Sequence, residues 1–245
     1  MSRVGIVSAL AAEARTLGRA SAASLGVRRL ADGMLLIVSG IGPSAATAAA
    51  RALASEGATA LASFGMAGAL DPALGCGTVL LPECVMLADG TRLATSASWR
   101  ERVRRALPAR CAARGGELLS SLEPIGSASE KKTLWRATGA AAVDMESAAI
   151  AQIAAERSLP FIAVRVIVDL STDELPRAVI AASRGGRLAP GRLLAGLACA
   201  PGDLGSLLRL SARYRCARSV LREIGRPASA ARRALGGGAA PESTR

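Results

Sequence analysis

Carboxylates at the ends of apolar runs are the residues of this chain best suited to chemistry. Glu13 follows an apolar run at the N-terminus, and Asp169 ends another. Asp144 and Glu146 bracket Met145 in a stretch that is otherwise apolar. A carboxyl group in apolar surroundings can act as a general acid or base, or can accept hydrogen bonds from substrate hydroxyls. Because the chain contains no histidine, acid–base chemistry must fall to carboxylates, lysine, cysteine or the single tyrosine.

Each carboxylate also has an ordinary structural interpretation. Glu13 fits the solvated first turn of a helix, Asp144 fits a helix cap, and Asp169 fits a cap or a turn. Burying such groups without partners is costly, so their presence among apolar residues needs an explanation. The residues by themselves leave both interpretations open.

Two segments that contain glycine each follow a predicted strand. Ser39-Gly40-Ile41-Gly42 precedes Pro43, which suits the first turn of a helix, so the segment could hold an anion at the helix N-terminus. An ordinary tight turn has the same composition. The segment Gly65-x-x-Gly68 is equally ambiguous.

Composition excludes several classes of site. Without histidine, the chain cannot form a Ser-His-Asp or Cys-His nucleophile or a His-ligated metal centre. Aromatic residues make up 2% of the chain, too few to stack on single-stranded nucleic acid, so we expect no nucleic-acid partner. The five cysteines show no C-x-x-C spacing, which argues against disulfides and a thiolate metal site and favours a reducing compartment.

The elements that must position these residues alternate between strand and helix. Apolar runs separated by helices predict an α/β domain with a mostly parallel sheet covered on both faces, in which ligands bind at the carboxyl ends of strands. The predicted strands cover 4–10, 34–39, 58–64, 78–86, 140–145 and 161–169, and the predicted helices cover 43–57, 99–107 and 146–157.

A charge boundary divides the chain near Pro176. Residues 177–245 contain 13 Arg, no Lys and three acidic residues, a net charge of +10, whereas residues 1–176 carry only +2. We therefore expect a nearly neutral catalytic domain over 1–176 and a basic helical extension over 177–226 packed on it, with helices at 188–200 and 204–224. Residues 227–245, rich in Gly, Ala and Pro, are expected to form a flexible tail.

The N-terminal residues loosely mimic a signal peptide, because Arg3 precedes an apolar run. That run is short and leads directly to Glu13 and Arg15, which favours a buried first strand. No apolar run approaches the roughly 18 residues that a membrane span needs. We therefore expect a cytoplasmic protein.

Taken in order, these segments resemble the purine nucleoside phosphorylase and methylthioadenosine/adenosylhomocysteine nucleosidase superfamily. Residues 143–149 (V-D-M-E-S-A-A) are similar to its V-E-M-E-x-x-A signature, and residues 164–169 (V-R-V-I-V-D) to its V-R-x-x-S-D strand. The resemblance is strongest to the hopanoid-associated phosphorylases, which share the A-A-E-A-R start and the F-G-x-A-G variant. Further matching segments are Val4–Glu13, Ser39–Gly42, Phe64–Gly68, Gly77–Val79 and Pro201–Leu204.

The resemblance implies a three-layer αβα fold with a mixed, mostly parallel central sheet, and cleavage of a purine N-glycosidic bond. Asp169 would protonate the departing base at N7, and Glu13 with Arg165 would hold the attacking water. Glu146 would accept hydrogen bonds from the ribose hydroxyls, and Met145 would pack against the sugar. Further substrate contacts are implied for Phe64, Gly65, Met66, Ala67 and Asp144, and contacts to the nucleophile or phosphate for Ser39, Gly40, Ile41 and Gly42.

The chain also departs from the family pattern. Val168 replaces the serine before the acid, and Met66 replaces a serine that helps to hold the nucleophile. The arginine of the phosphate loop of hexameric phosphorylases is not evident, which favours water, although inorganic phosphate stays open as a co-substrate. No other cofactor and no metal are implied. A base-contacting loop is expected to be shortened around Gly126–Thr133, near Lys131 and Lys132, which would widen the pocket for a bulky 5′ group.

The hopanoid-associated subgroup implies adenosylhopane as substrate, converted to ribosylhopane or its 1-phosphate. Such a substrate resides in a membrane, so the arginine-rich helices could dock on anionic lipid at the inner membrane face. Alternatively, these helices only cover the sheet or form an oligomer interface. We expect a homo-oligomer. Competing functions are a methylthioadenosine/adenosylhomocysteine-type nucleosidase, a general purine nucleoside phosphorylase, or a membrane- or nucleic-acid-binding module on an inactive scaffold.

Overall fold

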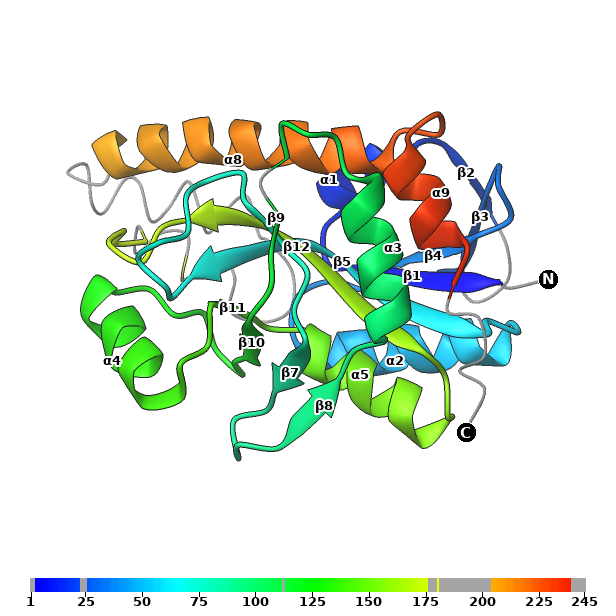
Figure 1. Ribbon diagram of the computed structural model, residues 1–245, viewed down its shortest axis with the longest axis horizontal. Helices are drawn as coiled ribbons and strands as arrows, with labels where there is room; N and C mark the ends of the chain where they lie inside the picture. Colours follow the sequence, from blue (N-terminus) through cyan, green and yellow to red (C-terminus); the bar gives the residue numbers. More distant parts are fainter. Residues whose placement is uncertain (1–2, 23–25, 112, 176–179, 181–203, 239–245) are drawn as a thin grey trace.

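The computed structural model shows three layers, a mixed β-sheet between two groups of helices (Figure 1). It describes residues 3–22, 26–111, 113–175, 180 and 204–238. The strands are β1 (Val4–Ser8), β2 (Ala20–Ala22), β3 (Arg28–Leu30), β4 (Leu35–Val38), β5 (Ala60–Ala69), β6 (Val79–Leu80), β7 (Cys84–Met86), β8 (Arg92–Ala94), β9 (Ala113–Arg114), β10 (Glu117–Ser120), β11 (Ala142–Asp144) and β12 (Phe161–Asp169). The helices are α1 (Ala11–Ala14), the 3-10 helix η1 (Arg15–Leu17), α2 (Pro43–Ser55), α3 (Ala97–Ala106), α4 (Ala128–Thr138), α5 (Ser147–Glu156), α8 (Leu204–Gly225) and α9 (Ala230–Gly236).

Strands β5 and β12 form the centre of the sheet. The two strands are parallel, and their pairing begins with Phe161 of β12 opposite Leu61 of β5. On the other edge of β5, β1 is also parallel to it. Nearly every residue of β12 is buried, including those on both faces of the strand, as its apolar sequence, interrupted only by Arg165, predicts for a covered parallel strand. Residues at the ends of these strands are therefore positioned by a buried part of the sheet.

The sheet is mixed because two neighbours oppose this central direction. β11 pairs antiparallel with the end of β5, and β6 pairs antiparallel with β12. The path β2-β3-β4-β1-β5-β11-β10-β7-β8 carries the remaining strands, with β6 and β9 attached through β12. This arrangement confirms the predicted three-layer α/β fold with a mixed central sheet.

Helices α2 and α5 cover one face of the sheet. α2 begins with Pro43 in its first turn after Gly42, whose φ of 97° a residue with a side chain would adopt only with strain. α5 is rich in alanine and buried on most sides, so it packs closely against α2 and β5. The core on this face is aliphatic, as the composition predicts.

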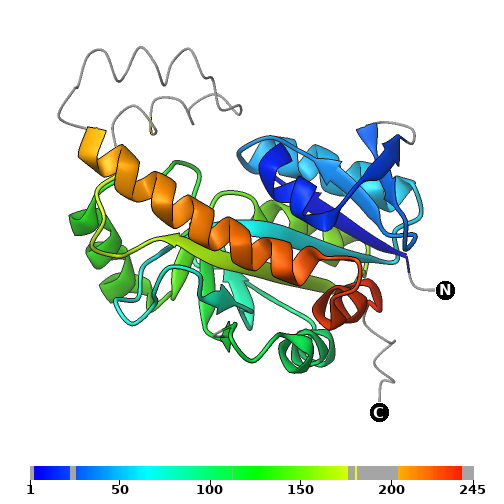
Figure 2. The same cartoon turned by 90° about the horizontal axis from the view of Figure 1, so that it is seen from above.

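Helices α3, α8 and α9 cover the opposite face (Figure 2). The long helix α8 lies along β12 and buries Ala217, Leu221 and Ile224 in this second core cluster. Its bounds agree with the helix predicted at 204–224. The helix predicted at 188–200 lies outside the described residues.

The strand predicted over 78–86 is wrong, because the chain forms two strands there. β6 pairs with β12 and β9, whereas β7 pairs with β10 and β8. Pro82 lies between them and has no backbone N–H to donate to a continuous ladder.

The expected flexible tail is also wrong for residues 227–238. Ala230–Gly236 form α9, which packs against α3 and buries Ala231 and Leu235. Arg232 is 2% exposed and donates to Asp32 Oδ2 at 2.6 Å and to the carbonyl oxygens of Leu17 and Gly225. These contacts come from distant segments, which explains why composition alone misread the region.

Among the helices of the described ranges, none has the length and apolar character needed to cross a lipid bilayer.

Candidate active site

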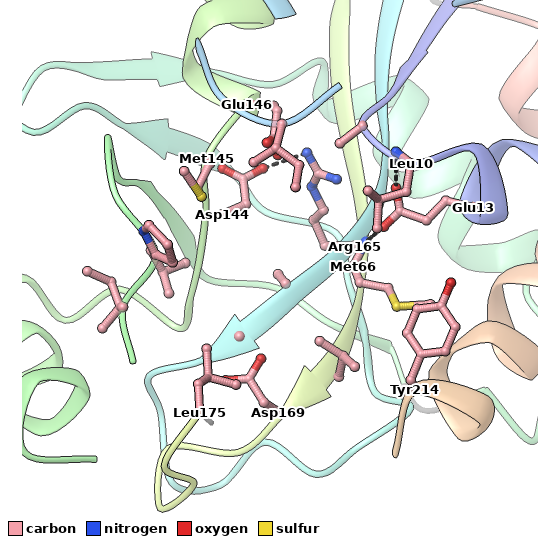
Figure 3. A pocket seen from close by; sticks show the side chains of 18 of the residues that line it. Leu10, Glu13, Met66, Asp144, Met145, Glu146, Arg165, Asp169, Leu175 and Tyr214 are labelled. Carbon is pink, nitrogen blue, oxygen red and sulfur yellow. Dashed lines mark hydrogen bonds and ion pairs between the residues drawn. The ribbon is translucent and has the colours of Figure 1, made fainter. Parts of the chain in front are cut away.

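One cavity of about 290 Å³ lies where β5, β11 and β12 meet, beside α1 and α8 (Figure 3). Its wall includes Glu13, Asp144, Glu146, Arg165 and Asp169, so the structure brings together the charged residues that the sequence singled out. All five are buried, which means that each needs a partner inside the protein.

Glu13 sits in α1, directly after β1, and points toward the cavity. Its Oε1 accepts a hydrogen bond from the backbone N–H of Met66 at 2.9 Å, and its Oε2 accepts from the N–H of Leu10 and the hydroxyl of Ser8, both at 3.2 Å. Burial raises the pKa of Glu13 above its usual value, and the nearby Arg165 guanidinium opposes part of this rise. A carboxylate held in this way can accept a proton from a bound water.

Arg165 is turned inward from the middle of β12 and is 2% exposed. It forms an ion pair with Asp144 Oδ2 at 2.6 Å and donates to the hydroxyls of Ser63 at 2.6 Å and Ser147 at 3.0 Å. Asp144 is held in turn by the Ser120 hydroxyl at 3.0 Å. The charge of Arg165 is therefore neutralised within the wall of the cavity.

Glu146 lies at the N-terminus of α5 and contacts the glycine segment at 40–42. Its Oε1 accepts a hydrogen bond from the backbone N–H of Gly42 at 2.8 Å. Burial, together with the charge of Asp144, raises the pKa of Glu146 to about 7. The N–H that the sequence suggested for an anion is thus bound by a carboxylate of the protein itself.

The remaining residues of that segment differ in position. Ile41 lines the cavity, whereas Ser39, Gly40 and Gly42 do not belong to its wall. The Ser39 hydroxyl donates to the carbonyl oxygen of Gly40 at 2.8 Å.

Asp169, the last residue of β12, has a partner that the sequence did not indicate. Lys131 of α4 places its Nζ 2.5 Å from Asp169 Oδ2. The Lys131 side chain is fully buried. Gly68 of β5 lies so close that a Cβ atom there would be 2.9 Å from Asp169 Oδ2. The expected loop around Gly126–Thr133 is in fact the start of α4, which is how Lys131 reaches the acid.

The β5 residues fall into two groups. Met66, Ala67 and Gly68 line the cavity, and Gly65 lies behind it against Glu13 and Arg165. Phe64 is fully buried in the core cluster under α8 and does not line the cavity.

Helix α8 adds two residues that sequence reasoning missed. Leu210 and Tyr214 line the cavity, and Figure 3 shows the Tyr214 ring beside Met66. Burial, with the nearby Glu13 carboxylate, raises the pKa of Tyr214. The helix placed in the basic extension thus contributes to the wall of the cavity, and its spacing of leucines carried no signal of this position.

The rest of the wall is mostly apolar. Ile125, Val143, Met145, Val168 and Leu175 surround the space between the charged groups. Over the described ranges, no group of three or more Cys, Asp or Glu side chains is placed to hold a metal ion.

Comparisons with known proteins agree with this architecture. Residues 4–189 match the family described as the phosphorylase superfamily. No curated protein sequence matches the chain. Among solved structures, the 5′-methylthioadenosine/S-adenosylhomocysteine nucleosidase of Neisseria meningitidis in complex with methylthio-immucillin-A superimposes with a TM-score of 0.68 at 21% identity, covering 96% of this chain and 98% of that chain.

Two structures from Helicobacter pylori are also similar. The nucleosidase of the same kind with butyl-thio-DADMe-Immucillin-A has a TM-score of 0.66 at 18% identity, covering 91% of this chain and 97% of that chain. Futalosine hydrolase has a TM-score of 0.65 at 18% identity, covering 81% and 97%. At these identities the likeness establishes the fold, and the family match over most of the chain establishes membership. The chain belongs to the phosphorylase superfamily, a family of enzymes.

Proposed function

We propose that this enzyme cleaves the N-glycosidic bond of an adenine nucleoside and releases adenine. The observation that carries the proposal is the separation of charged groups in one cavity. Glu13, Glu146 and Arg165 gather at one end, and Asp169 lies at the other, with apolar walls between them (Figure 3). A nucleoside needs this division, because negative charge develops on the departing base while positive charge develops on the sugar.

In the proposed reaction, the bond from the sugar to the base breaks and its electron pair goes to the base. A proton from Asp169 reaches N7 of the base, and the sugar becomes oxocarbenium-like. Glu146 accepts hydrogen bonds from the ribose hydroxyls, and Met145 packs against the ring. Water attacks the opposite face of the sugar and gives its proton to Glu13, whose pKa is raised by burial, which makes it a stronger base than an ordinary carboxylate.

The groups that could bind phosphate are already paired with carboxylates of the protein, which favours water as the nucleophile. Arg165 is the only Lys or Arg in the described wall of the cavity, and Asp144 neutralises it. The N–H of Gly42 is bound by Glu146. Phosphorolysis would require these partners to separate, whereas a water molecule needs only the carboxylate of Glu13.

For the substrate, we propose adenosylhopane, which would yield ribosylhopane, or its 1-phosphate if phosphate attacks. The resemblance to the hopanoid-associated phosphorylases supports this assignment, as do the apolar side chains of Leu175 and Leu210 in the wall. A methylthioadenosine/adenosylhomocysteine-type nucleosidase is the alternative within enzymes, because two of the similar structures are nucleosidases of that kind. A general purine nucleoside phosphorylase would instead require phosphate.

Because such a substrate resides in a membrane, we also propose that α8 docks the enzyme on anionic lipid at the inner face of the membrane. The outer side of α8 exposes Arg209, Arg215 and Arg222, and Leu208 is 63% exposed. Each basic residue near an anionic surface contributes about 1 kcal/mol. Co-sedimentation with anionic vesicles at low and high salt tests this, and the absence of salt-sensitive binding leaves α8 as a cover for the sheet or an oligomer contact.

The activity is tested by incubating the protein with adenosylhopane and with methylthioadenosine, each with and without phosphate, and identifying products by mass spectrometry. We expect adenine from the wild type and a loss of at least about 100-fold in Asp169→Asn, since general acid catalysis contributes factors of this size. Asp89→Asn is the matched control, because Asp89 lies in the turn between β7 and β8. Adenine release that persists in Asp169→Asn would refute the assignment. Salt-dependent DNA or lipid binding without adenine release would favour the binding module.

A further inference from the structure

Lys131 is a fully buried lysine that belongs to no core cluster. Its Nζ lies 2.5 Å from Asp169 Oδ2, 2.9 Å from the carbonyl oxygen of Leu170 and 3.2 Å from that of Asp173. An ammonium group carries three hydrogens, and each has one acceptor here. A neutral amine would have two hydrogens and would direct its lone pair at an acceptor. The three acceptors around Nζ therefore fit an ammonium group that donates to a carboxylate of Asp169.

This arrangement raises a question about the proposed reaction, which requires a proton from Asp169. A carboxylate has none to give. Asp169 lines the cavity, whereas Lys131 is not part of its described wall. Lys131 can therefore act on a substrate only through Asp169.

The other charged groups near Asp169 are already occupied. Asp173, in the loop after β12, is ion-paired with Arg213 of α8 and accepts from the N–H of Leu170 at 2.7 Å. Glu174 accepts from the N–H of Ala128 at the start of α4, at 3.0 Å. Glu123, before α4, lines the cavity. The neighbours of Lys131 on α4, Glu130 and Lys132, are exposed. Lys131 is the cation that faces Asp169.

We propose that Lys131 is a positioning residue that stores the proton for the leaving base and supplies it through Asp169. As the bond from the sugar to the base breaks, the base gains electrons and becomes a stronger proton acceptor. One N–H bond of Lys131 breaks and an O–H bond forms on Asp169, whose proton passes to N7. Lys131 becomes a neutral amine, and Asp169 is again a carboxylate. After the base leaves, solvent water in the cavity protonates Asp169, and this proton passes back to Lys131, so that the pair returns to its starting state.

This inference rests on the proposed function, and its own signature is the alkaline limb of the pH profile. In the wild type, the proton for the base comes from Lys131 and need not already reside on Asp169, so we expect adenine release to persist to alkaline pH. In Lys131→Met, only a protonated Asp169 can react, and the alkaline limb of kcat moves to lower pH by more than about one unit. If the only effect of Lys131 were to disfavour the protonated form of Asp169, the alkaline limb of Lys131→Met would instead move to higher pH.

Lys131→Arg provides the second test and is informative even if the methionine variant does not fold. Arginine keeps the charge beside Asp169, but it does not release a proton in proteins. We expect KM to stay near the wild-type value and kcat to fall at least about 10-fold. Lys132→Met, the exposed neighbour on the same helix, should match the wild type.

The outcomes separate this inference from the proposed function. If Asp169→Asn retains adenine release, the proposed function fails. If Asp169→Asn is inactive while Lys131→Arg keeps the wild-type kcat, or Lys131→Met keeps or raises the alkaline limb, the inference about Lys131 is overturned and the proposed function stands.

Discussion

Glu13 and Arg165 face the same small space beside Gly65 of β5. A Cβ atom at position 65 would lie 2.5 Å from Arg165 Nη1 and 2.9 Å from each carboxylate oxygen of Glu13. The missing side chain thus allows a carboxylate from α1 and a guanidinium from β12 to approach the same backbone. This proximity lets Arg165 oppose the burial that raises the pKa of Glu13.

Gly65→Ala should therefore damage the site directly. The added methyl group must displace Arg165 or Glu13, and we expect kcat/KM to fall at least about 100-fold, with a cost of about 1–3 kcal/mol in the free energy of unfolding. Kinetic assays and urea unfolding measure the two effects. Gly75→Ala is the matched control, because no atom lies within 4 Å of its Cβ position. Equal activity of the two variants would contradict this packing.

Glu146 should make stability fall as pH rises. Its pKa is raised to about 7 in the folded protein from 4.5, so between these values the folded state keeps a proton that the unfolded state has lost. The stabilisation is present at about pH 4.5 and is lost by about pH 7, an effect on the order of 3 kcal/mol.

The comparison for Glu146 is Glu146→Gln, which keeps an oxygen for the Gly42 N–H but does not titrate. Urea unfolding at several pH values should show the wild type losing stability relative to this variant up to about pH 7, and no further relative change above it. A constant difference between the two proteins across this range would show that Glu146 titrates normally. The pKa of Glu13 is also raised by burial, but Glu13 is present in both proteins.

Tyr214 should contribute to substrate binding through its ring. Tyr214→Ala removes apolar surface from the wall formed by α8, and we expect KM to rise about 10-fold with a smaller change in kcat. Tyr214→Phe keeps the ring and should behave like the wild type. A loss of kcat in the phenylalanine variant would instead assign the hydroxyl a part in the chemistry.

Arg232 should anchor the C-terminal helix α9. Arg232→Met removes its bonds to Asp32 and to two carbonyl oxygens, and we expect a cost of about 2–4 kcal/mol in the free energy of unfolding. Arg233→Met, its exposed neighbour, should cost less than about 0.5 kcal/mol. Similar stabilities for the two variants would mean that α9 adds little to the fold.

Local sequence predicted the elements that carry their own pattern. Phe161–Asp169 is apolar apart from Arg165 and ends in an acid, so both its extent and the place of Asp169 at its end follow from the residues. α8 was predicted nearly to its bounds by its helical spacing of leucines. The strand predicted at 78–86 failed, because the same apolar residues serve two different strands on either side of Pro82.

By itself, the sequence determined the α/β class, the absence of histidine chemistry and the carboxylates that gather in the cavity. Only the tertiary structure decided that Lys131 pairs with Asp169 and that Tyr214 of α8 faces the pocket. The reason is physical. A strand end is marked by local residues, whereas the side of a helix that meets an active site depends on how distant segments pack. Lys131 looks like an ordinary charged residue of α4 until β12 brings an acid 2.5 Å from it.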